Sequence, residues 1–321
     1  MSELLVAKGI KKYFPLETSL FKRLYVRAVD GVDLSLGKRE ILGLVGESGS
    51  GKSTLGRIIA GLIRPDQGSV YFNGEEIISR NKTVPDKYRH AIQMIFQNPD
   101  TSLDPRMIVF DILADAMKNR YNTLSKTEVT ERIIKLIRLV GLREDHMYKY
   151  PHELSGGEKQ RIAIARALSV DPMIIIADEI VSALDVSIRA QILNLLLDIV
   201  ESRDLSMIFI THDIGLVWSI TDRVAIMYLG KIVEFGDTER VLINPQHPYT
   251  KMLLTSSTSI LVGKIFRDPM FRVRGEPPSP IDPPKGCRFS TRCPLVDKEC
   301  LLNEPILREV EHNHFVACLK A

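Results

Sequence analysis

The chain has 321 residues, of which 45% are hydrophobic and 26% are charged. This composition is typical of globular proteins and excludes a chain that is disordered throughout. The formal net charge of +3 argues against a polycation that binds nucleic acid, and no apolar stretch reaches the roughly 20 residues needed to span a bilayer. The N-terminal residues lack the apolar core of a secretory signal, so we expect a cytoplasmic protein.

The first 75 residues alternate short strand-like runs with turns and contain a glycine-rich loop. The apolar run 41–45 (ILGLV) predicts a buried parallel strand. The loop 46–54 (GESGSGKST) follows directly, and the apolar residues after it have helical spacing until Pro65. A strand, a glycine-rich loop and a helix in this order are typical of a phosphate-binding loop.

The residue types in this loop suit phosphate binding. Its glycines let the backbone N–H groups from Gly49 to Thr54 turn toward phosphates without side-chain obstruction. Lys52 supplies a positive charge for the β- and γ-phosphates, and the Ser53 hydroxyl can ligate Mg²⁺. The alternative is a glycine-rich turn with no ligand, which the strand before it and the helix after it disfavour.

Residues from about 100 to 165 have a helical pattern. Ser125 and Glu128 have the spacing of a capping box, and Gly141 can end the helix that follows them. Five apolar residues are expected to line one face of this helix: Val129, Ile133, Leu136, Ile137 and Val140.

The motif 154–158 (LSGGE) precedes another helix-like run. Ser155 and the two glycines after it predict a second anion-binding site at a helix start. A simple helix cap explains Ser155 equally well, but not the pair of glycines. Because one nucleotide does not need two such sites on one chain, we expect this one to cover the γ-phosphate of an ATP bound to another chain.

A second α/β stretch begins at 173–179 (MIIIADE), an apolar strand that ends in two carboxylates. Asp178 can hold Mg²⁺ through its water shell, and Glu179 is placed to orient or deprotonate an attacking water. The alternative is an acidic strand end that only faces solvent, which the upstream phosphate-binding loop disfavours. A helix-like run at 187–202 and a strand-like run at 206–213 follow, so a mostly parallel sheet is predicted.

The tail from about 245 differs in composition. Residues 275–286 (GEPPSPIDPPKG) contain five prolines and predict a stiff, extended linker. All four cysteines lie beyond it: Cys287, Cys293, Cys300 and Cys318. Disulfides are not expected in a reducing compartment, and four thiolates suit zinc or an iron–sulfur cluster. Zinc sites favour closer cysteine pairs than these, and unliganded thiols are the third possibility.

The order of these motifs resembles the ATP-binding cassette family, the nucleotide-binding subunits of ABC transporters. The resemblance rests on six features: the loop 46–54, Gln97, 154–158, the strand ending at Glu179, 182–185 (SALD) and His212. It implies an α/β P-loop NTPase over residues 1–245, with a RecA-like parallel-sheet core and an N-terminal antiparallel β subdomain. An α-helical signature subdomain is expected at about 100–165, and a small Cys-rich extension at 246–321.

The resemblance also assigns roles to individual residues. It implies that Glu179 and His212 are catalytic, and that Tyr13 or Phe14 stacks on adenine. The other implied nucleotide-binding residues are Gly46, Glu47, Ser48, Gly49, Ser50, Gly51, Lys52, Ser53, Thr54, Gln97 and Asp178, with Ser53 and Gln97 as Mg²⁺ ligands. The residues implied to contact the nucleotide of a partner chain are Ser155, Gly156, Gly157 and Asp185.

The tail narrows the resemblance to the ATPases of oligopeptide and dipeptide importers. Three segments look like their C-terminal extension: 247–250 (HPYT), 275–280 (GEPPSP) and 286–294 (GCRFSTRCP). Three others look more like the second, "F"-type ATPase subunit: 13–32, 102–107 (SLDPRM) and 227–236 (MYLGKIVEFG). The resemblance points to a 4Fe–4S cluster on the four cysteines, with zinc as the alternative.

The implied function is ATP hydrolysis that powers the import of dipeptides or oligopeptides through a membrane permease, with ATP sandwiched between two ABC subunits. The implied partners are a second ABC ATPase, two transmembrane permease subunits and, indirectly, an extracellular or periplasmic peptide-binding protein, but no nucleic acid. The chain would lie peripherally on the cytoplasmic face of the membrane. Alternatives are an importer of nickel or another small solute, and a soluble ABC ATPase that acts on nucleic acid. Ile180 stands where the family often has proline, which leaves the reach of Glu179 open.

Overall fold

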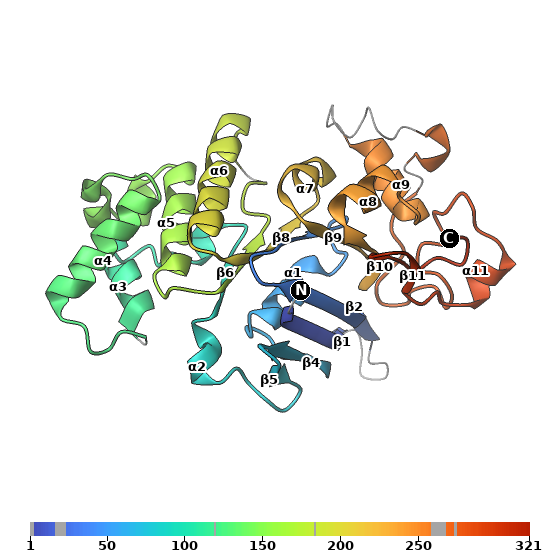
Figure 1. Cartoon of the computed structure of the whole chain (residues 1–321), viewed down its shortest axis with the longest axis horizontal. Coiled ribbons are helices and arrows are strands. Elements are labelled where there is room, and N and C mark those ends of the chain that lie inside the picture. The colour runs from blue at the N-terminus through green and yellow to red at the C-terminus, as the bar shows by residue number, and fades with distance from the viewer. Residues whose placement is uncertain (1–2, 17–23, 119, 183, 258–267, 273–274) are drawn as a thin grey trace. The chain divides into compact units, whose positions relative to one another are not determined.

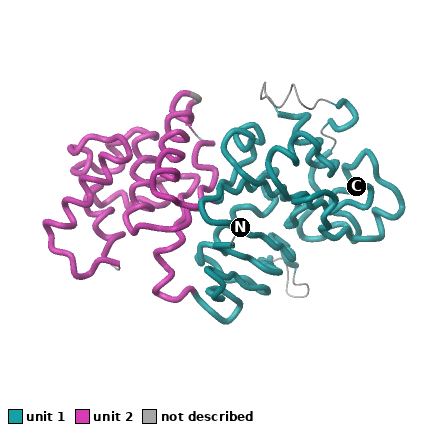
Figure 2. Tube along the Cα trace, viewed as in Figure 1, with its two compact units in different colours: residues 1–83, 208–321 teal, residues 84–207 magenta. Residues whose placement is uncertain are grey.

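The chain forms two compact units in the computed structural model (Figure 2). Unit 1 comprises residues 1–83 and 208–321, and unit 2 comprises residues 84–207. The structure describes residues 3–16, 24–118, 120–182, 184–257, 268–272 and 275–321. Part of the segment 13–32 (residues 17–23) and Ala183 of the SALD motif therefore lie outside the described residues. Within the described ranges, no helix combines the length and apolarity that a membrane crossing needs.

Unit 1 contains a four-stranded antiparallel sheet, as expected for the N-terminal subdomain, with strand order β2-β1-β4-β5. Its strands are β1 (Glu3–Leu16), β2 (Leu24–Gly37), β4 (Gln67–Phe72) and β5 (Glu75–Ser79). Buried and less buried residues alternate along β4, as expected of a strand with one covered face.

A second sheet in unit 1 holds the strand that leads into the glycine-rich loop. Its strands are β3 (Ile41–Val45), β8 (Ser206–Thr211, in unit 1 from Ile208 onward), β9 (Arg223–Tyr228), β10 (Lys231–Asp237), β11 (Arg308–Glu311) and β12 (His314–Val316), in the order β11-β12-β10-β9-β3-β8. The strands β3 and β9 are parallel, as predicted.

The edge of this sheet formed by β10, β12 and β11 is antiparallel, which the sequence analysis did not predict. Strands β9 and β10 are joined by only two residues, Leu229 and Gly230, both with positive φ. Such a connection forms a hairpin and cannot cross over to a parallel neighbour. The C-terminal strands β12 and β11 then add to the edge of β10. The C-terminal strands thus belong to the same sheet as β3, the strand that leads into the glycine-rich loop.

Figure 1 labels five helices of unit 1. They are α1 (Lys52–Ile59), α7 (Ile214–Ile220), α8 (Thr238–Ile243), α9 (Pro248–Ser256) and α11 (Lys298–Leu302), with a 3₁₀ turn η4 (Pro269–Phe271). Three of them, α7, α8 and α9, share a hydrophobic core with this sheet. One hydrophobic core joins Val45 of β3 to Tyr249 of α9 and to Phe289, with Cys287 and Cys293 packed against it. The Cys-rich extension therefore shares its core with the strand before the loop.

A buried carboxylate–imidazole pair ties the edge hairpin to the start of α9. The side chains of Glu234 and His314 are both fully buried, and Nε2 of His314 lies 2.7 Å from Oε1 of Glu234. The same carboxylate accepts hydrogen bonds from the backbone N–H groups of Gln246 (2.7 Å) and His247 (3.0 Å). A buried carboxylate is tolerated only when it is satisfied in this way.

Unit 2 is mainly helical, with two parallel strands (Figure 1). Its elements are α2 (Asp86–Arg89), β6 (Ile92–Ile95), η1 (Pro99–Thr101), α3 (Val109–Lys118), α4 (Lys126–Leu139), η2 (Glu144–Tyr148), η3 (Pro151–Glu153), α5 (Gly156–Leu168), β7 (Ile174–Asp178) and α6 (Val186–Ser202). The capping box of Ser125 and Glu128 is confirmed at the start of α4. Of the five apolar residues predicted to line its inner face, Ile133, Leu136, Ile137 and Val140 are buried and Val129 is partly buried.

Candidate functional site

The glycine-rich loop 46–54 joins β3 to α1, as the sequence predicts. Gly51 has φ 104°, and a Cβ at this position would lie 2.0 Å from the carbonyl oxygen of Ala28. Only glycine fits there, because a side chain would clash and the left-handed backbone disfavours one. A hydrogen bond from the Ser50 N–H to the Glu47 carbonyl (3.2 Å) closes the turn before it. The loop is therefore a fixed bend.

Lys52 is the first residue of α1, and it is buried. Its Nζ donates to the carbonyl oxygens of Gly46 (2.7 Å) and Glu47 (2.9 Å). The N-terminus of α1 has no side-chain cap and no acidic residue in its first turn, so its N–H groups and dipole suit an anion held by the loop. The remaining predicted residues lie around it: Ser48 and Gly49 are exposed on the loop, and Ser53 and Thr54 follow in α1.

The two candidate adenine-stacking residues are neighbours near the end of β1. Tyr13 pairs with Arg27 of β2, and Phe14 pairs with Val26, so the two rings point to opposite faces of the strand. The Tyr13 hydroxyl donates to Asp30, and the Arg27 guanidinium lies 5.9 Å from the Tyr13 ring centroid. Burial, followed by the bond to Asp30, raises the pKa of Tyr13 to about 12. The ring of Tyr13 is thus held in place by its neighbours.

The end of β7 in unit 2 brings Gln97 and Glu179 into contact. The strand is buried along its whole length and ends at Asp178. The Gln97 Nε2 donates to Oε2 of Glu179 (3.1 Å) and also lies 3.2 Å from the Ser182 hydroxyl. Ser182 in turn donates to the Glu179 carbonyl (2.9 Å). Sequence reasoning singled out Gln97 and Glu179 but gave Ser182 no role.

The backbone at Glu179 is strained. Its φ is 48°, in the left-handed region that costs a residue with a side chain about 1–2 kcal/mol. The Ser182 N–H donates to the Glu179 carbonyl (3.0 Å), which closes the turn, and Ile180 is buried. With isoleucine in place of the family's usual proline, the Glu179 carboxylate still reaches Gln97.

Ser155 caps α5 in unit 2 through a capping box with Glu158. The Glu158 Oε2 accepts from both the backbone N–H and the hydroxyl of Ser155 (2.8 Å each), and the Glu158 N–H donates back to the hydroxyl (3.4 Å). His146 lies 3.0 Å from Oε1 of the same carboxylate. The hydrogen bond from the Ser155 N–H, followed by that from His146, lowers the pKa of Glu158 to about 2. The helix-cap interpretation of Ser155 is therefore correct in this structure.

The two glycines after Ser155 differ in their surroundings. A Cβ on Gly157 would lie 2.9 Å from Cγ2 of Ile188 in α6, whereas one on Gly156 would meet Leu184 at an ordinary 3.8 Å. Gly157 is thus required by close packing. Asp185, predicted to act across chains, is exposed and directly precedes α6.

His212 follows β8 in unit 1 and is exposed. The turn around it is fixed on its C-terminal side, because Asp213 caps α7 by accepting from the Gly215 N–H (2.9 Å). His212 and Lys52 belong to unit 1, whereas Gln97 and Glu179 belong to unit 2.

The four cysteines lie in one neighbourhood of unit 1. The Cys287 N–H donates to the Cys300 carbonyl (2.8 Å). Burial, with a smaller contribution from the other three thiols, raises the pKa of Cys287 to about 11. However, among the residues that the structure describes, which include all four cysteines, no group of three or more His, Cys, Asp or Glu side chains is placed to hold a metal ion. The donor types fit a thiolate-bound cluster, but their placement does not form a site.

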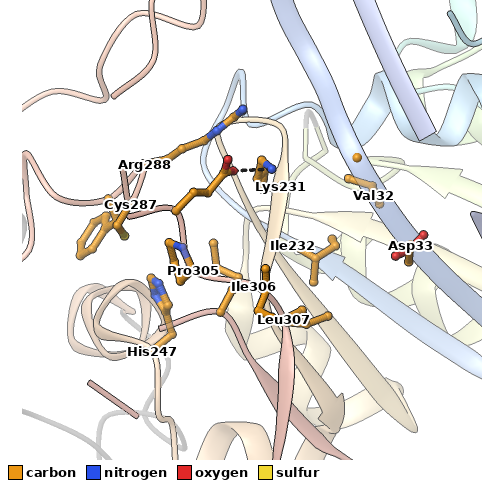
Figure 3. A pocket seen from close by; sticks show the side chains of 15 residues that line it. Val32, Asp33, Lys231, Ile232, His247, Cys287, Arg288, Pro305, Ile306 and Leu307 are labelled. Carbon is orange, nitrogen blue, oxygen red and sulfur yellow. Dashed lines mark ion pairs between the residues drawn. The ribbon is translucent and has the colours of Figure 1, made fainter. Parts of the chain in front are cut away.

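A cavity of about 360 Å³ lies beside Cys287 and Arg288 (Figure 3). Its wall includes Lys231, which pairs with Glu304, and the buried ring of His247. The His247 Nδ1 accepts from the Tyr249 N–H (3.0 Å) at the start of α9. Burial lowers the pKa of His247 to about 3, so this ring is neutral.

Two contacts to the glycine-rich loop come from residues that the sequence analysis used only as marks of resemblance. The Tyr249 hydroxyl accepts from the Glu47 N–H (2.8 Å), and the Arg292 guanidinium pairs with the Glu47 carboxylate. The sequence contained one indirect signal: the carboxylate of Glu47 weakens anion binding by the loop unless a cation balances it, but nothing local identifies that cation as Arg292.

Two family models match the chain. The model described as "ABC transporter" matches residues 29–182. The model described as "Oligopeptide/dipeptide transporter, C-terminal region" matches residues 233–300.

Curated relatives match nearly the whole chain. The dipeptide transport ATP-binding protein DppF of Haemophilus influenzae is 45% identical over 317 residues, which is 98% of this chain and 96% of that protein. The oligopeptide transport ATP-binding protein AppF of Bacillus subtilis is 45% identical over 319 residues, with the same coverage of 98% and 96%. The oligopeptide transport ATP-binding protein OppF of Escherichia coli is 46% identical over 299 residues, which is 92% of this chain and 88% of that protein.

Solved structures of similar fold include an ATP-binding cassette and a part of an ABC transporter complex. A dimeric, post-hydrolysis structure of the cassette MJ0796 bound to ADP and Pi has a TM-score of 0.63 at 28% identity, covering 73% of this chain and 98% of that one. The structure of cbiO1 from Clostridium perfringens, part of the ABC transporter complex cbiONQ, has a TM-score of 0.64 at 26% identity, covering 76% and 92%.

Proposed function

The chain belongs to the ABC transporter family, among the ATP-binding proteins of dipeptide and oligopeptide transport, and we propose that it powers the import of dipeptides or oligopeptides through a membrane permease. It is an ATPase of the ABC type. The observation that carries the peptide assignment is the match of residues 233–300 to the C-terminal region of oligopeptide/dipeptide transporters.

We propose the following division of the chain and of its partners. Residues 1–245 form the ATPase domain, with its helical subdomain at about 100–165, and residues 246–321 form the extension. A second ABC ATPase subunit, which is a distinct paralogue, and two permease subunits complete the transporter. A peptide-binding protein outside the membrane delivers the substrate. The chain lies peripherally on the cytoplasmic face of the membrane.

The fixed bend of the loop and the uncapped start of α1 support phosphate binding by residues 46–54. The N–H groups of 49–54 and the ammonium of Lys52 bind the phosphates. Ser53 and Gln97, with Asp178 through water, are the proposed ligands of Mg²⁺, which when bound offsets charge on the phosphate oxygens. For adenine we propose Tyr13 rather than Phe14, because the Tyr13 ring is fixed by Asp30 and Arg27.

For hydrolysis we propose that Glu179 accepts the proton of the attacking water. Gln97 supports this role because its amide already holds the carboxylate in position, 3.1 Å away. His212 is the proposed hydrogen-bond donor to the γ-phosphate. The rest of catalysis is positioning and charge stabilisation, as expected for phosphoryl transfer.

We propose that Ser155, Gly156, Gly157 and Asp185 act on the nucleotide of a partner subunit. The solved neighbour MJ0796 is described as dimeric, which supports this arrangement. To bind a γ-phosphate, the Ser155 hydroxyl has to turn away from Glu158, which holds it here at 2.8 Å. Closure of the dimer around ATP would supply the differential binding energy for this change.

The test uses the intact transporter with Glu179→Gln, and Glu201→Gln at the exposed end of α6 as the control. The Glu179 variant is expected to bind ATP normally but to lose roughly 100-fold or more in turnover and to stop peptide uptake. The control is expected to match the wild type. Native ATP turnover in the Glu179 variant would contradict the base assignment, and uptake of nickel but not of peptides by the wild type would contradict the substrate.

We propose that the four cysteines bind a 4Fe–4S cluster, with zinc as the alternative. Their common neighbourhood and thiol-only donor set support this. Because no three of the described thiols are placed to share an ion here, binding requires their side chains to rotate. Anaerobic purification with iron, sulfide and zinc analysis, repeated on Cys293→Ser, tests it. A colourless wild-type protein without iron would contradict the cluster.

A further inference from the structure

The second residue of the phosphate-binding loop, Glu47, puts a negative charge into a segment that binds phosphates. A carboxylate at this position weakens the binding of any anion unless a cation balances it. The ammonium of Lys52 donates to the carbonyl oxygens on either side of the Glu47 peptide N–H, those of Gly46 and Glu47. The position of the Glu47 backbone therefore also determines the position of the Lys52 ammonium.

Arg292 balances the charge of Glu47 with a two-point contact. Its Nη1 donates to Oε2 (2.7 Å) and its Nη2 donates to Oε1 (2.9 Å), across 245 residues of sequence. The Arg292 side chain is 2% exposed and that of Glu47 is 26% exposed, so the pair is shielded from solvent on the arginine side. Bidentate pairs with a shielded partner are stronger and more directional than surface ion pairs.

A second contact fixes the backbone of the same residue. The hydroxyl of Tyr249, in α9, accepts from the Glu47 N–H at 2.8 Å. The Tyr249 ring is fully buried and packs against Tyr228 and Phe289 with centroids 4.6 and 5.5 Å apart. The Arg292 guanidinium lies 5.9 Å from the centroids of the same two rings. Both contacts to Glu47 are therefore anchored in one rigid aromatic cluster.

We propose that Arg292 and Tyr249 are positioning residues for ATP, and that the C-terminal region thereby forms part of the nucleotide site. The proposal rests on the ATP-binding function given above. Arg292 neutralises Glu47, and Tyr249 holds its backbone, so the loop presents Lys52 and its N–H groups in one arrangement. Glu47 lies in the segment matched by the ABC transporter model, whereas Arg292 and Tyr249 lie in the segment matched by the C-terminal model.

The experiment compares MgATP dissociation constants of full-length variants. Arg292→Gln leaves the Glu47 charge unbalanced, and we expect about tenfold weaker binding, equal to about 1.4 kcal/mol. Adding Glu47→Gln removes the charge, and the double variant is expected to return to within about threefold of the wild type. If the pair had only a structural role, the double variant would bind MgATP as weakly as Arg292→Gln, because it lacks the same contact.

The matched control is Arg223→Gln, which breaks another Arg–Glu pair of unit 1, that with Glu40 (3.2 Å). Arg223 lies opposite Leu42, at the end of β3 away from the loop, so ATP binding is expected to be unchanged. Thermal unfolding of each variant reports loss of stability separately from loss of binding. Equal weakening by both arginine variants would overturn the proposal.

The proposal is also overturned if Arg292→Gln binds MgATP as tightly as the wild type, or if the double variant is as weak as Arg292→Gln. Should Arg292→Gln not fold, Tyr249→Phe carries the test, since it keeps the buried ring and removes only the acceptor of the Glu47 N–H. We expect about threefold weaker binding for it, and unchanged binding overturns the proposal. If the wild type binds ATP but its transporter takes up no peptide, the proposed function is overturned while the roles of Arg292 and Tyr249 in ATP binding are not.

Discussion

The N-termini of α1 and α5 are both candidate anion sites, but they are built in different ways. At α1 the cap residue is Gly51, which provides no side-chain hydrogen bond, and the first turn contains no acid. At α5 the cap is Ser155, and Glu158 in the first turn satisfies both its hydroxyl and its N–H. The first site is thus open to an anion, whereas the second is closed by its own carboxylate.

The two helix starts also differ in which residues hold them in place. The loop before α1 is held by residues far along the chain, Arg292 and Tyr249. The start of α5 is held locally, by Glu158 and by His146, which lies twelve residues before Glu158 in the sequence. A helix that must bind phosphate with its own backbone leaves its local capping positions empty, so its stability has to come from elsewhere. In the proposed function, α5 would contact phosphate only after assembly, so it can cap itself until then.

The largest expected effect is on ATP binding, and it distinguishes the α1 site from the α5 site. Lys52→Ala removes the only side-chain ammonium of the loop and is expected to weaken ATP binding at least about 100-fold, or about 3 kcal/mol. Ser155→Ala is expected to leave binding by the isolated chain within twofold. Equilibrium binding of MgATP checks both. Equal loss in the two variants would remove the distinction between an open and a closed site.

The second prediction concerns the distant support of the loop. His247 caps the helix that carries Tyr249, and its pKa is about 3 in the folded chain against 6.5 in an unfolded one. Below pH 6.5 the unfolded chain takes up a proton that the folded chain refuses, so stability falls as the pH falls toward 3. Between pH 7.5 and pH 5 this amounts to about 2 kcal/mol.

The comparison variant is His247→Asn, because asparagine can also accept at a helix N-cap but does not titrate. Urea unfolding at both pH values is expected to show a larger loss for the wild type than for the variant. Identical losses would mean that burial of His247 does not control the pH dependence.

The third prediction concerns packing at α5. Gly157→Ala places a methyl group 2.9 Å from Ile188 and is expected to lower the free energy of unfolding by about 1–2 kcal/mol. Gly156→Ala is the matched control, since its methyl would meet Leu184 at 3.8 Å and cost little. Urea unfolding compares them. Equal stability of the two variants would show that the contact with Ile188 does not determine the cost at Gly157.

The smallest effect is expected from Glu158→Gln, which weakens the capping box by about 1 kcal/mol. The pKa of Glu158 is lowered to about 2, so its contribution is present above its ordinary pKa of 4.5 and is lost as the pH falls through 2. The stability difference between wild type and variant is therefore expected to shrink on acidification. A difference that stays constant from pH 6 to pH 3 would contradict the role of the carboxylate.

The features predicted correctly from the sequence are those fixed by near neighbours. The loop after β3 and the capping box at Ser125 follow from residue types a few positions apart. The Arg292–Glu47 pair joins positions 245 apart, and the Glu234–His314 pair joins positions 80 apart. Among 43 lysines and arginines and 40 acidic residues, no local signal selects these partners. The Glu234–His314 pair depends on β12 adding to β10, which a pattern of parallel strands did not predict.

The most direct test of this account measures ATP binding and ATP turnover side by side on the assembled transporter, with Ser155 and Gly156 both replaced by alanine. If the α5 end serves a nucleotide held by another subunit, binding at the loop stays within about twofold while turnover falls about 100-fold. Full turnover with both residues replaced would mean that one chain completes its own site, and would contradict the account.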